Sequence, residues 1–121
     1  MKPHTGQCLC GSVKYTLPGE LSGVISCHCK DCQRLHGIYN PMVVVPRNDL
    51  ILTEEKGLAW YPSSEESERG FCKKCGSALF MRTEARALVS AGSLDDPTGL
   101  KNLKNIFTDD AGEYYDLPAE A

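Results

Sequence analysis

Apolar and polar residues alternate over short stretches of this chain, and this alternation predicts β-strands. Residues 12–17 (Ser-Val-Lys-Tyr-Thr-Leu) alternate with a period of two, which is typical of a strand with one buried face. The turn residues proline, asparagine, aspartate and glycine separate the predicted strands, as at residues 46–49 and 56–57. Other short runs are rich in β-branched and aromatic residues and predict further strands at 24–26, 39–45, 50–53, 58–61, 78–81, 87–90 and 105–108.

A sustained apolar stripe with a period of 3.6 residues is missing, and only residues 30–36 are expected to form a short helical turn, before Gly37. Many short strands at roughly regular spacing predict an all-β fold of short antiparallel strands. We expect one domain over residues 1–121, because a domain usually has ~100–200 residues. The residues predicted to form its core are Val13, Tyr15, Val44, Leu52, Trp60, Phe71, Leu79 and Val89.

Charge and hydropathy exclude several classes of partner. The chain has 13 Lys and Arg against 16 Asp and Glu, a formal net charge of −3, so it lacks the positive field that nucleic-acid binding needs. Its longest clean apolar run, residues 42–45, is far shorter than the ~20 residues of a membrane span. The first seven residues contain no apolar stretch of the kind a secretory signal requires, so a cytoplasmic protein is expected.

Seven cysteines fall into three tight groups: Cys8 and Cys10, then Cys27, Cys29 and Cys32, then Cys72 and Cys75. An odd number cannot all pair into disulfides, and in the reducing cytosol clustered cysteines more often bind metal. Neighbours this close also make strained disulfide rings. Zinc is the expected ion, because thiolate-rich sites suit zinc and zinc needs no redox partner.

Seven thiolates fill one four-coordinate site and leave a second site one ligand short. A structural zinc is closed by four protein ligands, whereas a catalytic zinc keeps one position open. A Cys-x-x-Cys knuckle commonly pairs with a second two-cysteine element, so we expect Cys8 and Cys10 to share a structural zinc with Cys72 and Cys75. The group from Cys27 to Cys32 would then hold a second zinc by itself, giving two zincs per chain.

Histidines and redox chemistry offer alternatives to an open second site. His36 follows Cys32 by four residues and could supply a fourth ligand, which would make the protein a non-enzymatic zinc-binding module with both metals structural. His28, between two ligands, is a weaker candidate because its side chain would tend to point away from theirs. A thioredoxin-like pair at Cys29 and Cys32, or at Cys72 and Cys75, lacks the strand–helix–strand context of that motif. His4 is interpreted as a solvated tail residue.

Three motifs resemble those of a known family. They are residues 6–15 (GQCLCGSVKY), 27–34 (CHCKDCQR, followed by Gly37) and 69–79 (RGFCKKCGSAL). In this order they are similar to the glutathione-dependent formaldehyde-activating enzyme family, which includes centromere protein V. The resemblance implies a zinc-binding β-tent-like fold, a structural zinc on the outer cysteine pairs and a catalytic zinc on Cys27, Cys29 and Cys32. It also implies carbon–sulfur lyase activity that interconverts S-hydroxymethylglutathione with glutathione and formaldehyde.

The C-terminal part departs from the family pattern. Members often have a Trp-containing segment after a His-containing strand, whereas the matching stretch here is 105–107 followed by 113–115 (Glu-Tyr-Tyr), without that His or Trp. This tail is a candidate for lining the substrate cleft.

The expected chemistry is Lewis-acid activation of a small thiol or thiol adduct, since zinc with an open position lowers the pKa of a bound water or thiol. An acidic protein must meet the carboxylates of glutathione locally, and Lys30 and Arg34 flank the central cysteines. Gln33 is a candidate hydrogen-bond donor to the substrate. Arg69, Lys73 and Lys74 are expected only to solvate the structural knuckle. An unpaired strand edge, if the sheet has one, would favour a homodimer.

Overall fold

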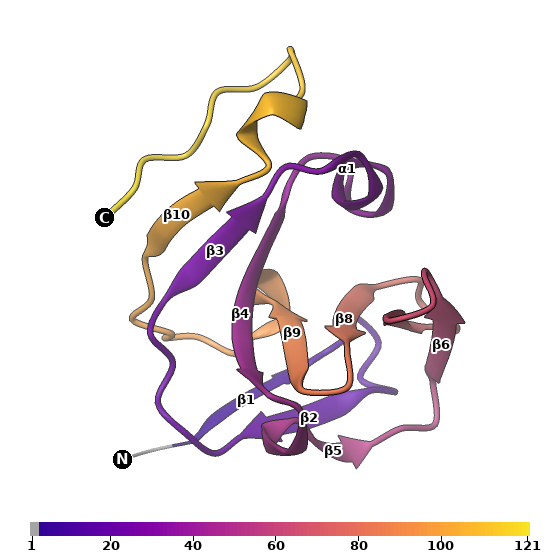
Figure 1. Ribbon diagram of the computed structural model, residues 1–121. Helices are drawn as coiled ribbons and strands as arrows, with labels where there is room; N and C mark the ends of the chain where they lie inside the picture. The colour runs from indigo at the N-terminus through magenta and orange to yellow at the C-terminus, as the bar shows by residue number, and fades with distance from the viewer. Residues whose placement is uncertain (1–2) are drawn as a thin grey trace.

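Two β-sheets form the framework of the computed structural model, which describes residues 3–121 (Figure 1). The three-stranded sheet has the order β1–β2–β5 and is built from β1 (His4–Gln7), β2 (Lys14–Leu17) and β5 (Ile51–Glu54). The seven-stranded sheet has the order β10–β3–β4–β9–β8–β7–β6. Its strands are β3 (Val24–Cys27), β4 (Asn40–Pro46), β6 (Leu58–Pro62), β7 (Glu68–Cys72), β8 (Ala78–Arg82), β9 (Arg86–Ser90) and β10 (Asn102–Ile106).

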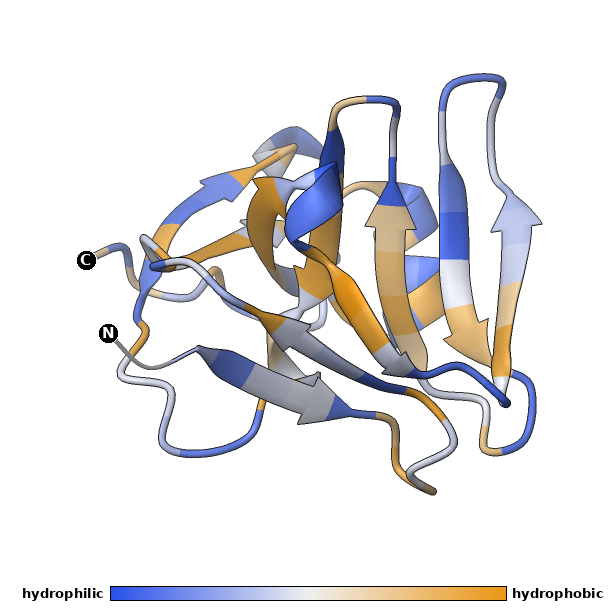
Figure 2. Cartoon of the chain, turned by 90° about the horizontal axis from the view of Figure 1, so that it is seen from below, coloured by the Kyte–Doolittle hydropathy of each residue, from blue (hydrophilic) through white to orange (hydrophobic). Residues whose placement is uncertain are grey.

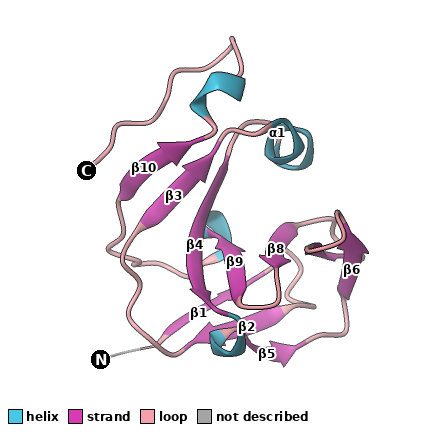
Figure 3. Ribbon diagram, in the orientation of Figure 1, coloured by secondary structure: helices cyan, strands magenta, loops and turns pink. Residues whose placement is uncertain are grey.

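Helix is confined to short segments, so the predicted all-β fold is confirmed (Figure 3). The α-helix α1 (Lys30–His36) covers the predicted helical turn and ends at Gly37, whose φ of 83° suits a glycine. The three-residue 3₁₀ turns are η1 (Arg47–Asp49), η2 (Ala91–Ser93) and η3 (Thr108–Asp110). Along residues 3–121, no helix has the length and apolar character needed to cross a membrane.

One strand pair departs from the expected antiparallel arrangement, because β10 runs parallel to β3. The chain leaves β9 and passes the three-stranded sheet, where Asp95 N–H donates to Thr5 O at 2.9 Å. It then returns to the start of β3, where Val24 N–H donates to Lys101 O at 2.9 Å. This long crossover allows β10 to enter beside β3 in the same direction, which a tight hairpin cannot do.

The sequence pattern did not predict β1 or β7. His4, interpreted as a tail residue, begins β1, and Gly6 of that strand packs so closely on Tyr15 that a side chain there would clash with the ring. In β7, Gly70 lies against Trp60 and Phe80 in the same way. Both strands are rich in polar residues and glycine, so they depend on their neighbours in the sheet and carry little apolar signal of their own.

The main core contains side chains from both sheets, including Tyr15 and Leu17 of β2 and Phe80 of β8. Apolar residues line the central strands, and hydrophilic residues occupy the tips of the hairpins (Figure 2). Among the predicted core residues, Val13, Tyr15, Leu79 and Val89 are buried, whereas Leu52, Trp60 and Phe71 are half-buried. The prediction for Val44 is wrong: its side chain is 36% exposed, because the pleat of β4 turns Val43 and Val45 inward.

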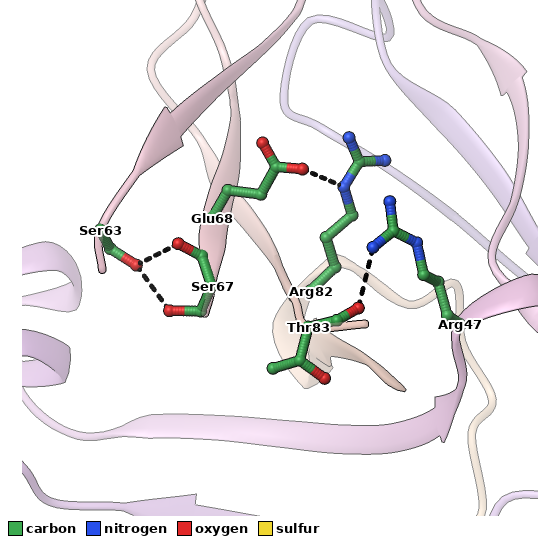
Figure 4. Close-up of polar contacts among 6 residues, drawn as sticks. All are labelled: Arg47, Ser63, Ser67, Glu68, Arg82 and Thr83. Atoms are coloured by element: carbon green, nitrogen blue, oxygen red, sulfur yellow. Dashed lines mark hydrogen bonds and ion pairs between the residues drawn. The ribbon is translucent and has the colours of Figure 1, made fainter. Parts of the chain in front are cut away.

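Polar contacts fasten the outer hairpins of the large sheet (Figure 4). Glu68 and Arg82 are opposite each other on β7 and β8, and Arg82 Nε donates to Glu68 Oε1 at 2.6 Å. The Arg82 guanidinium also lies 3.7 Å from the ring centroid of Trp60 on β6. Ser63 and Ser67 share a hydroxyl–hydroxyl contact of 3.0 Å in the β6–β7 turn. Arg82 therefore links three adjacent strands through its charge and its flat face.

Candidate metal centres and adjoining cleft

Four cysteines from two distant parts of the chain converge at one end of the sheets. The four-sulfur cluster consists of Cys8, Cys10, Cys72 and Cys75, whose sulfurs all lie within 4.8 Å of one another. Cys10 Sγ is 3.8 Å from Cys8 Sγ and 3.7 Å from Cys72 Sγ. A tetrahedral zinc with Zn–S bonds of ~2.3 Å requires sulfurs about 3.8 Å apart. The donor set and its spacing therefore fit a closed zinc site.

Local hydrogen bonds shape this cluster before any metal binds. Hydrogen bonds from Ser77 lower the pKa of Cys75 to about 5, and the contact with Ser12 lowers the pKa of Cys10. Burial raises the pKa of Cys72. Two partly or fully exposed thiols thus favour the thiolate form, while the buried one gains most from a cation that stabilises its charge.

The three-sulfur cluster consists of Cys27, Cys29 and Cys32, whose sulfurs also lie within 4.8 Å of one another. Cys27 ends β3, and Cys29 caps α1 by accepting a hydrogen bond from Cys32 N–H, at 3.4 Å. A hydrogen bond between Cys27 and Cys32 lowers the pKa of Cys27 and raises that of Cys32, and burial raises the pKa of Cys29. The three thiols therefore differ in how readily they lose a proton, and a cation that binds all three must displace their protons.

Within residues 3–121, no fourth His, Cys, Asp or Glu has a ligand atom within 4.8 Å of all three sulfurs. His36 is at the last turn of α1 and lines the neighbouring cavity. Burial, and after it the charge of Arg69, lowers the pKa of His36. The ring of His28 is fully buried and bonded elsewhere. The closure by His36 that the sequence left open is therefore not present in this arrangement of side chains.

The C-terminal segment, residues 102–121, holds the loop that carries the three-sulfur cluster. His28 Nε2 is 3.0 Å from Asn105 Oδ1, and His28 Nδ1 is 2.9 Å from Tyr115 Oη. Asn105 Nδ2 donates to Pro118 O at 2.9 Å, which turns Oδ1 toward the imidazole. His28 Nε2 thus carries the hydrogen, and Nδ1 accepts from Tyr115. The sequence predicts that this tail lines the cleft, whereas in the structure Tyr115 contacts His28, on the loop that carries the cysteines.

The predicted substrate residues have unequal positions. Lys30 and Arg34 are exposed. Gln33 is buried, and its Nε2 donates to His28 O at 2.9 Å and to Asp110 O at 2.6 Å, so both amide hydrogens are used within the chain. The side chain of Gln33 therefore fastens α1 to the C-terminal segment.

Arg69 lies at a different cluster from the one that the sequence predicts. It was expected to solvate the four-sulfur knuckle, but its Nη1 lies 3.9 Å from Cys32 Sγ in the other cluster. In β7, Cys72 and Gly70 alternate with Arg69 and Phe71, so Arg69 points to the opposite side of the strand from Cys72. Predicting β7 as a strand would have given this orientation.

A cleft lies beside the three-sulfur cluster and extends toward the four-sulfur cluster. A cavity of about 310 Å³ has mainly apolar walls between α1 and strands β7 and β8, including Leu35, Phe71 and Phe80. Arg69 connects this cavity with the three-sulfur cluster, because it lines the cavity and contacts Cys32. A wider cavity of about 640 Å³ shares His36 and Asn40 with the first and reaches Cys8. Such a volume and lining suit a small molecule.

The chain is similar to several known proteins. Residues 3–110 match the family model described as glutathione-dependent formaldehyde-activating enzyme. An uncharacterized lyase of Schizosaccharomyces pombe is 30% identical over 80 residues, which cover 66% of this chain and 58% of that protein. A Podospora anserina protein, provisionally named a glutathione-dependent formaldehyde-activating enzyme, is 34% identical over 84 residues, 66% of this chain and 39% of that protein. The chain thus spans about half the length of these curated relatives.

Among solved structures, the crystal structure of a Rhodobacter sphaeroides protein has the same fold. The TM-score is 0.64 at 21% sequence identity, and the match covers 84% of this chain and 98% of that one. With the family model matching residues 3–110, the chain belongs to the glutathione-dependent formaldehyde-activating enzyme family.

Proposed function

We propose that this protein is a zinc-dependent carbon–sulfur lyase that splits a small S-hydroxymethyl thiol, such as S-hydroxymethylglutathione, into the thiol and formaldehyde, and rejoins them in reverse. Family membership and the lyase name of one relative support an enzyme of this kind. The observation that carries the proposal is a cluster of three sulfurs without a fourth donor from residues 3–121, next to a small-molecule cavity. Three thiolates provide the ligands of a zinc with an open position.

Zinc bound by Cys27, Cys29 and Cys32 would supply a Lewis acid that stabilises negative charge on sulfur. Three thiolates and one zinc have a formal charge of −3 + 2 = −1, and the guanidinium of Arg69 lies beside Cys32 to offset it. His36, which lines the cavity, has a pKa below its ordinary value and is therefore a neutral base at pH 7.

The reaction moves one proton from oxygen to sulfur by way of His36 and breaks the C–S bond. His36 accepts the hydroxyl proton of the adduct, and the O–H electron pair forms the carbonyl bond of formaldehyde. The C–S bond then breaks, its electron pair stays on sulfur, and the thiolate takes up the proton that His36 held. The adduct HO–CH₂–SR thus becomes CH₂O and HSR, with no oxidant or reductant.

The Cys29→Ser variant tests this proposal. We expect it to remain folded, to bind one zinc instead of two, and to lose release of formaldehyde from S-hydroxymethylglutathione, because Cys29 belongs only to the three-sulfur cluster. Zinc is measured by elemental analysis and folding by circular dichroism. The His36→Ala variant is the matched control for the metal and should keep two zincs.

Two results would contradict the proposal. A wild-type protein with two zincs that turns over no small thiol plus formaldehyde would favour a zinc-binding module in which both metals are structural. Loss of the second zinc in His36→Ala would show that His36 closes that site.

A further inference from the structure

Arg69 is a cation with unused hydrogen-bond donors. Its Nη1 contacts Cys32 Sγ at 3.9 Å, whereas its Nε is buried and has no hydrogen-bond partner. The ion pair that the structure contains within residues 3–121 joins Arg82 to Glu68, so no carboxylate in this part of the chain pairs with Arg69. A buried N–H without a partner is costly, so a water, an ion or a ligand that accepts from Arg69 Nε would be favoured there.

The space around Arg69 fits a ligand that is partly apolar and partly anionic. On one side it lines the cavity of about 310 Å³, whose walls are mainly apolar. On another it lines a smaller pocket of about 180 Å³ together with Arg34. Asp31 also lines this smaller pocket, but it forms no ion pair with either arginine. Two guanidiniums thus border one pocket next to the three-sulfur cluster.

We propose that Arg69, assisted by Arg34, binds a carboxylate of the thiol substrate, so that the site selects thiols that bear a carboxylate. The identification of the ligand as a thiol rests on the proposed function. A guanidinium presents several N–H groups in one plane and can hold a carboxylate with two of them while another contacts a sulfur. Arg69 would therefore hold the carboxylate at a fixed distance from the three-sulfur cluster, where the substrate sulfur reacts.

A simpler role for Arg69 makes a different prediction. If it only balanced the charge of the cysteine thiolates, its replacement would weaken the binding of all thiols equally, or release the second zinc. If it binds a carboxylate, its replacement would affect only ligands that have one. The comparison between charged and esterified ligands therefore separates the two roles.

Calorimetric binding of glutathione and of its diethyl ester, without aldehyde, to the zinc-loaded chain of residues 1–121 provides the test. We expect the ester to bind wild type roughly tenfold or more weakly, as for the loss of a charge-assisted hydrogen-bonded pair. In Arg69→Lys, which keeps the charge but loses the fork, glutathione should bind nearly as weakly as the ester, and ester binding should change little. Arg86→Met, at an exposed arginine of β9, is the control and should behave as wild type.

Equal binding of glutathione and its ester to wild type would overturn the proposal, and so would an equal loss for both ligands in Arg69→Lys. If Arg69→Lys loses its second zinc, the comparison of glutathione with its ester in the wild-type protein decides the question by itself. Binding is measured without aldehyde, so its outcome does not depend on the lyase reaction. If the protein binds glutathione more tightly than the ester but shows no turnover in the separate lyase assay, the lyase reaction is rejected and this inference stands. If the lyase assay shows turnover but glutathione and its ester bind equally well, the lyase reaction stands and this inference is rejected.

Discussion

His36 combines two features that affect its proton affinity, a partly buried ring and a nearby permanent cation. Burial, followed by the charge of Arg69, moves the pKa of His36 below its ordinary value of 6.5. Both effects disfavour the imidazolium form, so the neutral base is the form present in the cleft at pH 7. The same shift must appear in the stability of the protein, because the unfolded chain lacks both effects.

We predict that His36 makes folding less favourable as the pH falls through 6.5. Below this value the unfolded state gains a proton that the folded state takes up only at its lower pKa, so the free energy of unfolding falls through this window and then levels off. The His36→Asn variant lacks this contribution. Urea unfolding of both proteins between pH 5 and 8 should show the wild type losing more stability than the variant on acidification. A constant difference would contradict the pKa shift, since other titrating groups are common to both.

The sequence predicts the grouping of site residues that lie close together along the chain. It does not predict contacts or burial that depend on a residue far away in the sequence. The short spacing from Cys27 to Cys32 brings three sulfurs together in any compact loop, and the structure groups them as the sequence predicts. Arg69 contacts Cys32 across 37 positions, and the burial of Val43 instead of Val44 depends on the pleat of β4. Neither relation follows from local composition.

The C-terminal segment packs against the loop that carries the three-sulfur cluster and supports its backbone. β10 pairs with β3, and Ile106 of β10 is in register with Cys27. After β10, Asp110 O accepts from Gln33 of α1, and Tyr115 stacks on His28 with ring centroids 5.5 Å apart. Figure 1 shows the turn after β10 beside the connection from β3 to α1. This support lies behind the ligand loop and fixes the position of the backbone between two of its ligands.

Tyr115→Phe is expected to weaken zinc binding at the three-sulfur cluster and not at the four-sulfur cluster. Loss of the hydroxyl leaves His28 Nδ1 buried without a partner, at a cost of about 1–3 kcal/mol in the conformation that holds the loop between Cys27 and Cys29 in place. Competition with a chromogenic chelator would resolve the two affinities. Tyr61→Phe, which changes an exposed tyrosine on β6, is the control. Equal weakening at both clusters, or at neither, would contradict this role for the C-terminal segment.

Strands were predictable where apolar side chains alternate, as in β2, and were missed where a neighbouring element supplies the packing. β1 reads His-Thr-Gly-Gln and β7 reads Glu-Arg-Gly-Phe-Cys, and each glycine lies against an aromatic ring of an adjacent strand. Because glycine leaves room for these rings but adds no apolar signal, the sequence could not reveal these two strands. Missing β7 is also the reason that Arg69 was assigned to the wrong cluster.

At the scale of the whole molecule, a metal in one cysteine cluster would connect distant parts of the chain, whereas a metal in the other would connect neighbouring residues. The four-sulfur cluster brings the β1–β2 loop of the small sheet against the β7–β8 turn of the large sheet, with Cys10 and Cys72 separated by 62 positions. The three-sulfur cluster lies within one loop and the start of α1, where Cys29 and Cys32 are only three positions apart. A cross-link stabilises mainly by closing a loop, and the entropy of closure grows with loop length.

Removing the first zinc should therefore destabilise the fold more than removing the second. Cys10→Ser/Cys75→Ser leaves two of the four sulfurs that form the long-range link, and Cys29→Ser leaves two of the three that form the local one. The loop-length difference alone is worth about 2 kcal/mol at 25 °C by (3/2)RT ln(62/5), where 62 is the separation of Cys10 and Cys72 and 5 that of Cys27 and Cys32. Denaturant unfolding of both variants, each prepared with zinc, measures this gap, and hydrogen exchange should show β1, β2 and β5 losing protection first in Cys10→Ser/Cys75→Ser. If Cys29→Ser were destabilised as much, the four-sulfur cluster would not be what joins the two sheets.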